Sequence, residues 1–302
     1  MKKKKLLFTG GGGVFTETIW NYLSDKYDIF FADINPKKIF YKIPKQKKLK
    51  IAKGNSKNFL KSIKLLDKKY NFDLIIPNVD EEIYAISNSN YKNKKIFLPP
   101  LSFCKLTLNK LSFFNHLKKK KIENLNTYRL NFFKNFKKGK RYLIKPIYGR
   151  GSRFVGIVKN EKEIQNFLNF YNLRKKDFII QDYIIGTEYT VFVNKNKKKT
   201  VVIPIKVYQK KGITTHAKVE KNFMIEKHIK KLINYFNVKN CFNVQLIYKN
   251  KKIYILEINP RLSTTFALIV KSGYDPFDKK LSLKFFLKKK LKMYRYLTTR
   301  YY

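Results

Sequence analysis

Alternation between apolar and amphipathic segments in the first hundred residues constrains the fold more than any other feature of this sequence. The segments, in chain order, are residues 5–9, 14–27, 28–35, 58–70 and 72–77. The first, third and fifth predict strands, and the second and fourth carry apolar side chains at helical spacing. Strands separated by helices form a parallel sheet, because each helix returns the chain to the edge where the next strand begins. We therefore expect a parallel α/β domain over residues 1–99 that closes at a Pro-Pro pair.

The remaining two thirds of the chain follow a different pattern. Residues 100–122 predict one or two helices, and segments 161–172 and 226–237 predict one helix each. Strand-like segments now follow one another through short turns, which is typical of antiparallel sheets. These segments are residues 142–158, 178–194, 199–207 and 241–260. The second part is therefore expected to be an α+β domain over residues 100–302. For its C-terminus we favour a helix followed by a short strand within residues 293–302 over a membrane-surface helix.

The chain is strongly basic, with 68 Lys and Arg against 20 Asp and Glu and a net charge of +48. A nonenzymatic protein that binds nucleic acid or an anionic membrane is therefore one hypothesis. Lysine is spread over the whole sequence, however, and no segment combines clustered arginine with a nucleic-acid-binding motif. We interpret the charge as a coating of the surface and expect no specific nucleic acid partner. Against this background the few acidic residues and arginines become informative.

Hydrophobic residues make up 44% of the sequence, which is typical of a globular protein. No apolar run approaches the roughly 20 residues that a membrane-spanning helix needs. The apolar stretch after the N-terminal lysines is too short for a signal peptide. Cys104 and Cys241 lie inside apolar sequence, and we expect buried free thiols. We therefore predict a cytoplasmic protein without a membrane span.

The glycine-rich turn after the first strand is the first candidate site. A dinucleotide-binding fingerprint requires G-x-G-x-x-G after a strand. Gly10 and Gly12 supply the first two glycines, but Phe15 occupies the third position. We interpret the segment as a tight turn, and Asp33 after the next strand as a residue that either caps a turn or contacts a ribose. A nicotinamide-dependent oxidoreductase stays open as an alternative.

A second candidate is the loop that follows the strand at residues 142–144. Lys145 stands at its root, and Gly149, Gly151 and Ser152 lie within it. Glycine allows backbone N–H groups to converge on phosphate oxygens, and lysine adds a positive charge. A bare hairpin of this kind is common, so the pattern alone leaves phosphate binding and a plain turn equally open.

A third candidate is the bend within residues 178–194. Asp182 ends a strand, and Gly186 permits a turn before Glu188 begins the next strand. A purine would fit against Ile184 and pair with backbone groups there, while Glu188 would accept hydrogen bonds from ribose hydroxyls. Without other context, an edge bend with surface acids explains this pattern better.

Polar side chains at every second position mark the last strong strand of the sequence. Side chains alternate between the two faces of a strand, so Glu257, Asn259 and Arg261 are expected on one face. The same alternation predicts that Ile255 shares that face and that Leu256 takes the other.

A predicted hairpin turn at residues 249–252 brings a second strand beside this one. The pairing that it favours places Gln245 opposite Glu257, and a slip by one residue would separate them. Gln245, Glu257 and Asn259 would then present three oxygens on one patch, which suits Mg²⁺ with substrate phosphates as its other ligands. Arg261 would lie where charge develops on a transferring phosphoryl group. We favour this interpretation over a strand that frays into solvent.

Taken together and in this order, these segments resemble the ATP-grasp enzymes. The likeness is greatest to the branch of the carbamoyl-phosphate synthetase large chain and its single-copy carboxylate–amine ligase relatives. "LLFTGGGG" to "LIIPNVDEE" resembles the pre-ATP-grasp domain, and "IKPIYGRGSRFVGIV" resembles the hairpin that covers the phosphates. "IIQDYIIGTEYTV" resembles the adenine hinge, and "FNVQ" with "LEINPRLS" resembles the metal-binding strand pair. In "LNKLSFFNHL" the family's lysine is present as Lys110, but Asn109 replaces its aspartate.

The resemblance implies an α/β plus α+β fold with a Rossmann-like domain over residues 1–99 and an ATP-grasp domain over residues 100–302. The ATP-grasp domain would consist of a lid subdomain at about residues 113–180 and a metal-binding subdomain at about residues 181–302. Each subdomain would contain an antiparallel sheet, and Mg-ATP would bind between the two.

The resemblance also implies a role for each motif residue. Lys110 and Lys145 would contact the ATP phosphates, Gly151 and Ser152 would cover them, Asp182 and Ile184 would offer backbone groups to adenine, and Glu188 would bind ribose. Gln245, Glu257 and Asn259 would bind Mg²⁺ or Mn²⁺, and Arg261 would be the catalytic residue at the γ-phosphate. Arg150 stands where a small residue is commoner, so that it would reach phosphate or substrate. His216 falls in the segment 206–222, which matches the family poorly, and we expect it in a loop.

The function implied by this resemblance is ATP-dependent ligation. ATP would phosphorylate a small-molecule carboxylate to an acyl phosphate, and a small-molecule amine would then displace the phosphate. ATP and Mg²⁺ would be the cofactors, and a homodimer is compatible with this function. The sequence does not specify which carboxylate and which amine react.

Overall fold

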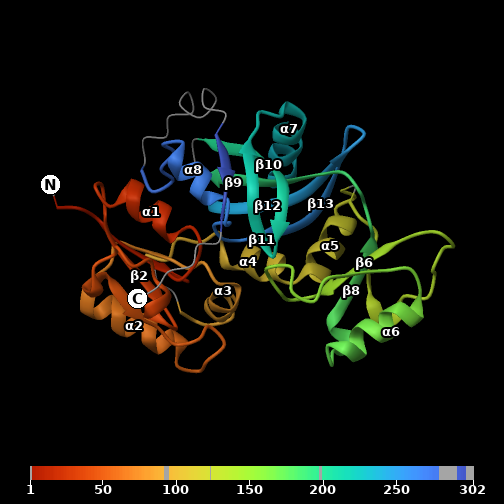
Figure 1. Cartoon of the computed structure of the whole chain (residues 1–302), viewed down its shortest axis with the longest axis horizontal. Coiled ribbons are helices and arrows are strands. Elements are labelled where there is room, and N and C mark those ends of the chain that lie inside the picture. Colours follow the sequence, from red (N-terminus) through yellow and green to blue (C-terminus); the bar gives the residue numbers. More distant parts are fainter. Residues whose placement is uncertain (1, 92–94, 123, 197–198, 279–290, 297–302) are drawn as a thin grey trace.

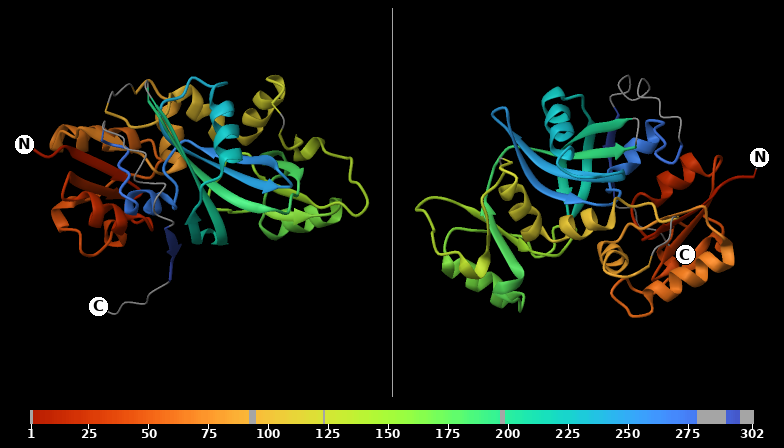
Figure 2. Two further views of the ribbon diagram at one scale, coloured as in Figure 1. Left: turned by 90° about the horizontal axis from the view of Figure 1, so that it is seen from above. Right: turned by 180° about the vertical axis from the view of Figure 1, so that it is seen from behind.

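The computed structural model describes residues 2–91, 95–122, 124–196, 199–278 and 291–296. The chain forms three sheets, and Figure 1 shows the largest of them in the centre of the molecule. Figure 2 shows the same arrangement from two other sides, with the N-terminal sheet and the lobe that carries α6 at opposite ends. The fold class expected from the sequence, a parallel sheet followed by antiparallel sheets, is confirmed.

The N-terminal sheet is parallel, with four strands in the order β3-β2-β1-β4. Its strands are β1 (Lys5–Thr9), β2 (Asp28–Asp33), β3 (Lys48–Lys50) and β4 (Leu74–Ile76). Its helices are α1 (Thr16–Leu23), α2 (Phe59–Tyr70) and α3 (Asp80–Ser87). Leu6, Leu7 and Phe8 of β1 are all fully buried, because elements cover both faces of the sheet.

The central sheet has six strands in the order β13-β12-β9-β10-β11-β14, and all its pairings are antiparallel. The strands are β9 (Thr187–Lys195), β10 (Thr200–Lys211), β11 (Ile213–Val219), β12 (Asn240–Lys249), β13 (Lys252–Asn259) and β14 (Lys292–Tyr294). Helices α4 (Leu101–Leu108), α5 (Lys110–Lys119) and α7 (Phe223–Ile233) contribute to a core on one face. Helix α8 (Phe266–Lys271) packs on the other face and shares a core with α1 and the parallel sheet.

The third sheet is antiparallel, with strands in the order β5-β8-β6-β7 and a small core of its own. It comprises β5 (Thr127–Arg129), β6 (Tyr142–Pro146), β7 (Gly156–Val158) and β8 (Phe178–Asp182), with α6 (Glu161–Phe170) packed on it. Four short 3-10 helices complete the described elements: η1 (Pro36–Lys38), η2 (Lys45–Lys47), η3 (Leu130–Phe132) and η4 (Lys175–Asp177).

Residues 100–122 form two helices, and Cys104 and Cys241 are free and buried, as predicted. Strand β14 falls partly in the predicted C-terminal strand and pairs with β11, whereas the helix expected before it lies outside the described residues. No helix in the described part of the chain is long and apolar enough to cross a membrane.

Candidate active site

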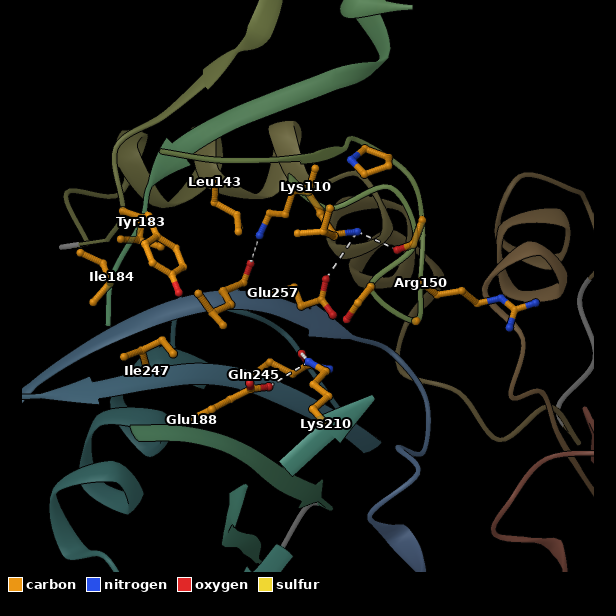
Figure 3. Close-up of a pocket in the computed structure, with 18 of the residues that line it drawn as sticks. Lys110, Leu143, Arg150, Tyr183, Ile184, Glu188, Lys210, Gln245, Ile247 and Glu257 are labelled. Atoms are coloured by element: carbon orange, nitrogen blue, oxygen red, sulfur yellow. Dashed lines mark hydrogen bonds and ion pairs between the residues drawn. The ribbon is translucent and has the colours of Figure 1, made fainter. Parts of the chain in front are cut away.

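A cavity of about 390 Å³ lies between the third sheet and the central sheet (Figure 3). Nine of the residues named from the sequence line it: Lys110, Lys145, Gly151, Ser152, Asp182, Ile184, Glu188, Gln245 and Glu257. They come from α5, from β6 and the loop after it, from the end of β8, the bend that follows and the start of β9, and from strands β12 and β13. The fold therefore gathers all seven residues expected at ATP, and two of the three expected metal ligands, around one space. Their roles stay predictions.

Lys110 joins α5 to the loop that follows β6. The side-chain oxygen of Asn109 accepts a hydrogen bond from the Ser112 N–H at 2.9 Å, which caps α5 and places Lys110 in its first turn. Lys110 Nζ donates to the Gly149 carbonyl oxygen at 2.8 Å and lies 3.5 Å from Glu257 Oε2. Asparagine thus supplies the cap at the position where the family has aspartate.

Lys145 projects from β6 into the centre of this cavity and is almost fully buried. Its Nζ donates to the carbonyl oxygen of Leu256 at 2.8 Å. Burial lowers the pKa of Lys145 to about 7, and Lys110 and Lys210 act in the same direction while Glu257 opposes them. The amine of Lys145 would therefore gain a proton when phosphate charge enters the cavity.

The hairpin of β12 and β13 has the register predicted from the sequence, with Gln245 opposite Glu257. The pairing shifts by one residue immediately beyond this pair, because Leu246 lies opposite Ile255 and Leu256 has no partner in the ladder. Ile255 is therefore buried in the core under the sheet while Glu257 faces the cavity. The prediction that Ile255 and Glu257 share a face is wrong, since strict alternation does not hold across a β-bulge.

Glu257, Gln245 and Asn259 offer oxygen atoms of the kind that Mg²⁺ prefers. The amide nitrogen of Asn259 donates to Glu257 Oε1 at 3.1 Å and to Asn243 Oδ1 at 3.4 Å, which leaves its own oxygen as an acceptor. Burial alone would raise the pKa of Glu257, but lysines and Asn259 lower it to about 2, so this carboxylate is charged at neutral pH. The described residues contain no group of three His, Cys, Asp or Glu suited to a metal, and two of these three candidate ligands are amides. The donor set fits Mg²⁺ that arrives with phosphate oxygens.

The other end of this cavity has the features expected for a nucleoside. Asp182 ends β8 with its carboxylate 2.9 Å from Lys140 Nζ. The backbone N–H of Ile184 donates no hydrogen bond to any described residue. Glu188 Oε1 accepts a hydrogen bond from Lys210 Nζ at 2.9 Å, and the same ammonium donates to Gln245 Oε1 at 3.2 Å (Figure 3). Lys210 therefore links the residue predicted at ribose to a residue predicted at the metal.

The loop between β6 and β7 has a backbone conformation that favours glycine. Gly151 has a φ of +65°, and Ser152 follows with a φ of +55°. A Cβ added at Gly151 would meet no atom within 4 Å, so the backbone conformation, and not lack of space, requires glycine there. Arg150 points away from Glu257 in Figure 3, and its Nε donates to the two carboxylate oxygens of Glu81 at 2.9 and 3.3 Å. The loop is thereby tied to α3 of the N-terminal domain.

A second cavity, of about 660 Å³, lies between the N-terminal domain and the central sheet. Arg261 lines this second cavity, and its Nε donates to Asp80 at the start of α3. Asn259 lines neither cavity, although it contacts Glu257. The residues that line both cavities are Arg150, Gly151, Ser152, Arg153, Lys210, Gln245 and Glu257. Gly151 and Ser152, which are predicted at the phosphates, and Gln245 and Glu257, which are predicted at the metal, therefore belong to the partition where the two cavities meet.

The N-terminal glycine turn also borders the second cavity. Asp33 Oδ2 accepts a hydrogen bond from the Gly12 N–H, and its Oδ1 accepts one from the Asn35 N–H, both at 2.9 Å. Asp33 thus caps the turn, which is one of the two roles predicted for it; the other was contact with a ribose. His216 lies on β11 between the rings of Tyr208 and Tyr294, with centroid distances of 4.6 and 4.1 Å. The expectation of a loop histidine is wrong, because the segment that matched the family poorly continues as strands β10 and β11.

A sequence profile of the ATP-grasp domain matches residues 107–265, which is more than half of the chain. The chain belongs to the ATP-grasp family. The matched segment runs from the end of α4 to the start of α8 and contains every residue that the sequence predicted for ATP, metal or catalysis.

Known structures show the same ATP-grasp fold over most of the chain. Carboxyaminoimidazole ribonucleotide synthase from Aspergillus clavatus, complexed with ATP, is 16% identical with a TM-score of 0.67, over 86% of this chain and 70% of that one. L-amino acid ligase from Bacillus licheniformis is 13% identical with a TM-score of 0.67, over 90% and 71%. N5-carboxyaminoimidazole synthetase from Staphylococcus aureus, complexed with ADP, is 16% identical with a TM-score of 0.67, over 91% and 75%. The ATP-grasp fold of this chain is thus one that ligases use with ATP and ADP.

Three residues that contact the predicted site were not identified from the sequence. Lys210 lies in the poorly matching segment, and many other lysines of the chain are equally plausible by sequence. Asp80 and Glu81 bind Arg261 and Arg150 from the start of α3. The available signal was the run Asp-Glu-Glu, because adjacent acids are unusual in a chain with only 20 acidic residues.

Proposed function

We propose that this ATP-grasp protein is an ATP-dependent ligase that joins a carboxylate to an amine through an acyl phosphate. ATP would occupy the cavity between the third and central sheets, and the two other substrates would occupy the second cavity. The observation that carries this proposal is the shared partition, in which Glu257, Gln245 and the glycine-rich loop line both cavities. A γ-phosphate held there would face the second cavity, where an acceptor carboxylate could reach it.

The residues of the partition, together with lysines, Asn259 and Arg261 beside it, suit phosphoryl transfer. Lys110 and Lys145 would neutralise phosphate charge, and the loop at Gly151 and Ser152 would cover the phosphates with its N–H groups. Gln245, Glu257 and Asn259 would hold Mg²⁺, which would supply positive charge to offset that of the phosphates. A carboxylate oxygen of the substrate would attack the γ-phosphorus as ADP leaves, and the amine would then displace phosphate from the acyl carbon. Arg261 would stabilise the transferring group by exchanging Asp80 for phosphate.

The adenine and ribose of ATP would bind at the other end of the same cavity. The unpaired N–H of Ile184 and the backbone of Asp182 would contact adenine, and Glu188 would bind ribose after Lys210 turns toward the phosphates. The structures of related fold that contain ATP or ADP support a nucleotide in this chain as well.

We propose the division into residues 1–99 and 100–302, with a lid subdomain and a metal-binding subdomain inside the second domain. Helix α5 packs in the core of the central sheet, so the lid as a structural unit would begin nearer β5 than residue 113. We also propose that the chain belongs to the carbamoyl-phosphate synthetase branch, that it is cytoplasmic and that it forms a homodimer.

Glu257 gives the most direct test of the proposal. We expect Glu257→Gln to lower the rate of ADP release about 10²–10³-fold in a screen of carboxylate and amine pairs, because one preorganised charge at the phosphates is lost. Glu161→Gln is the matched control, since Glu161 lies on α6 and lines neither cavity. The proposal fails if no pair stimulates ADP release, or if Glu257→Gln retains full turnover.

Two other functions make opposite predictions for the same protein. A basic nucleic-acid- or membrane-binding protein would bind with steep salt dependence and would not need Glu257. A nicotinamide-dependent oxidoreductase would bind NAD(H) in preference to Mg-ATP, which a fluorescence titration with both nucleotides would show.

A further inference from the structure

Two oxygen atoms without a donor among the described residues lie on the N-terminal side of the second cavity, and one of them, Asn78 Oδ1, is fully buried. Asn78 and Glu82 line this cavity, and their side chains are 9% and 3% exposed. Asn78 Oδ1 is buried and accepts no hydrogen bond from any described residue. Glu82 Oε2 accepts a hydrogen bond from Thr9, whereas no described residue donates to Glu82 Oε1. Buried acceptors are normally satisfied, so a ligand that supplies donors is the natural complement.

The hydrogen bonds around Thr9 fix the polarity of this pair. The Asn78 backbone N–H donates to Thr9 Oγ1 at 3.1 Å, so the hydroxyl proton of Thr9 is directed to Glu82. The Asn78 side-chain nitrogen is within 3.4 Å of the Thr9 carbonyl and 3.3 Å of the Ile76 carbonyl, and only its oxygen is left over. Asn78 Oδ1 and the carboxylate form of Glu82 therefore both present acceptors.

Charge pairing at the start of α3 singles out Glu82. Asp80 pairs with Arg261 and Glu81 pairs with Arg150, but among the described residues no lysine or arginine forms an ion pair with Glu82. Buried acids are almost always paired, and this chain carries a net charge of +48, so cations are not scarce. The charged groups that act on Glu82 are Asp33, Glu81 and Arg150.

The backbone holds Glu82 rigidly in this position. Any Cβ at Gly54 would come within 2.5 Å of the Glu82 N–H nitrogen and 2.9 Å of its Cγ. The loop at Gly54 therefore fits directly against Glu82 and leaves the side chain little freedom to turn away. A rigid acceptor pair is what a specific subsite requires.

We propose that Asn78 and Glu82 form the subsite for a primary amino group of the amine substrate, and that Glu82 takes a proton from that group. This inference rests on the proposed ligase function, which it deepens by locating the amine and naming its base. The ammonium form would donate to Asn78 Oδ1 and Glu82 Oε1, and it would supply the cation that Glu82 lacks.

Proton transfer to Glu82 would come before the new bond forms. The ammonium group gives one proton to the Glu82 carboxylate, which leaves a neutral amine with a free electron pair. The nitrogen attacks the carbonyl carbon of the acyl phosphate, the C–N bond forms, and the C–O bond to phosphate breaks with its electron pair on phosphate. The nitrogen then loses its second proton to the departing phosphate. Burial raises the pKa of Glu82 to about 8 in the free protein, and the positive charge of the bound ammonium would lower it again, so that the carboxylate is present to take the proton.

Binding can be tested without knowing the substrates. Protein labelled with ¹³C at the glutamate carboxyl carbons would be titrated with acid and base in methylammonium chloride or in tetramethylammonium chloride at equal concentration. We expect methylammonium, which has N–H donors, to lower the pKa of Glu82, and tetramethylammonium, which has none, to leave it unchanged. Glu82→Gln assigns the resonance, and Asn78→Ala should weaken the effect. Glu226 on α7 is the internal control, because its pKa is also raised by burial but it lines neither cavity.

Proton transfer is tested with a carboxylate that supports ADP release. Methylamine needs a base at neutral pH, whereas hydroxylamine is already neutral and forms a hydroxamate. We expect Glu82→Gln to slow amide formation with methylamine about 10²-fold or more while hydroxamate formation stays within a few fold of wild type.

The outcomes separate the two proposals. Equal effects of the two cations on Glu82, or equal losses with both acceptors, would overturn the subsite while leaving the ligase function in place. If no carboxylate supports ADP release, the ligase function fails, and the cation titration still decides whether Asn78 and Glu82 bind an ammonium group.

Discussion

Lys145 is a lysine whose surroundings set its protonation near neutral pH. It is buried beside Glu257 and Lys110, and its Nζ is held by the Leu256 carbonyl. Desolvation favours the neutral amine, whereas phosphate charge in the cavity would favour the ammonium. The residue type was evident from the sequence, but the direction of this pKa shift follows only from burial in the folded chain.

This shift predicts proton uptake when ATP binds. With a pKa of about 7 in the free protein, Lys145 is mostly neutral at pH 8.5, and bound phosphates would raise that pKa. ATP affinity should therefore fall as pH rises above 7, and calorimetry at pH 8.5 in two buffers of different ionisation enthalpy should show uptake of a proton. ATP itself does not titrate there. Lys145→Met should abolish the uptake, and equal uptake by that variant would contradict the assignment.

At the scale of elements, one extra residue in β13 decides what faces the active site. Leu256 is left out of the ladder, so Ile255 faces the core and Glu257 faces the cavity. Its carbonyl oxygen accepts the hydrogen bond from Lys145 of another sheet. A two-residue turn at Asn250 and Lys251, both with positive φ, sets the hairpin register on the other side of the bulge.

The glycine-rich loop provides a matched pair of variants. Gly151 and Gly139 have φ values of +65° and +74°, and an added Cβ meets no atom within 4 Å at either position. Alanine at either site should cost about 1–2 kcal/mol, because L-residues avoid this conformation. Only Gly151 lines the two cavities, so Gly151→Ala should weaken ATP binding and Gly139→Ala should not. ATP titration and urea unfolding of both variants would check this, and equal loss of ATP affinity would contradict it.

At the scale of the whole molecule, two arginines join the ATP-grasp domain to α3 of the N-terminal domain. The pair of Arg261 and Asp80 is mostly buried, with side chains 15% and 12% exposed. The pair of Arg150 and Glu81 is more open, at 34% and 42%. The partition between the cavities is thus anchored to the domain that supplies the proposed amine subsite.

These exposures predict unequal contributions to stability. Asp80→Ala should lower the free energy of unfolding by about 3–5 kcal/mol, because it leaves Arg261 buried without a partner. Glu81→Ala should lower it by about 0–1 kcal/mol, since water screens the exposed pair. Urea unfolding at fixed pH without ATP measures both, and similar losses for the two variants would show that burial does not set their strength.

Local patterns in the sequence were sufficient for the order of the elements, the family and the residues that line the first cavity. The alternation of strands and helices, the two glycine turns and the spacing of Glu257 from Asn259 are local features, because a strand or a turn depends on residues close together in the chain. The register of Gln245 against Glu257 was also accessible, since a short hairpin turn limits the possible pairings.

Tertiary structure alone decided the rest. The bulge at Leu256, the partners of Arg261 and Arg150, and the lack of a donor at Asn78 and Glu82 depend on residues that are distant in sequence. Burial and charge pairing arise only when these segments meet, so the chain shows which polar groups exist but not which are left unpaired. That difference is why the residues of the proposed nucleotide site could be named from the sequence, whereas the proposed amine subsite had to be found in the folded molecule.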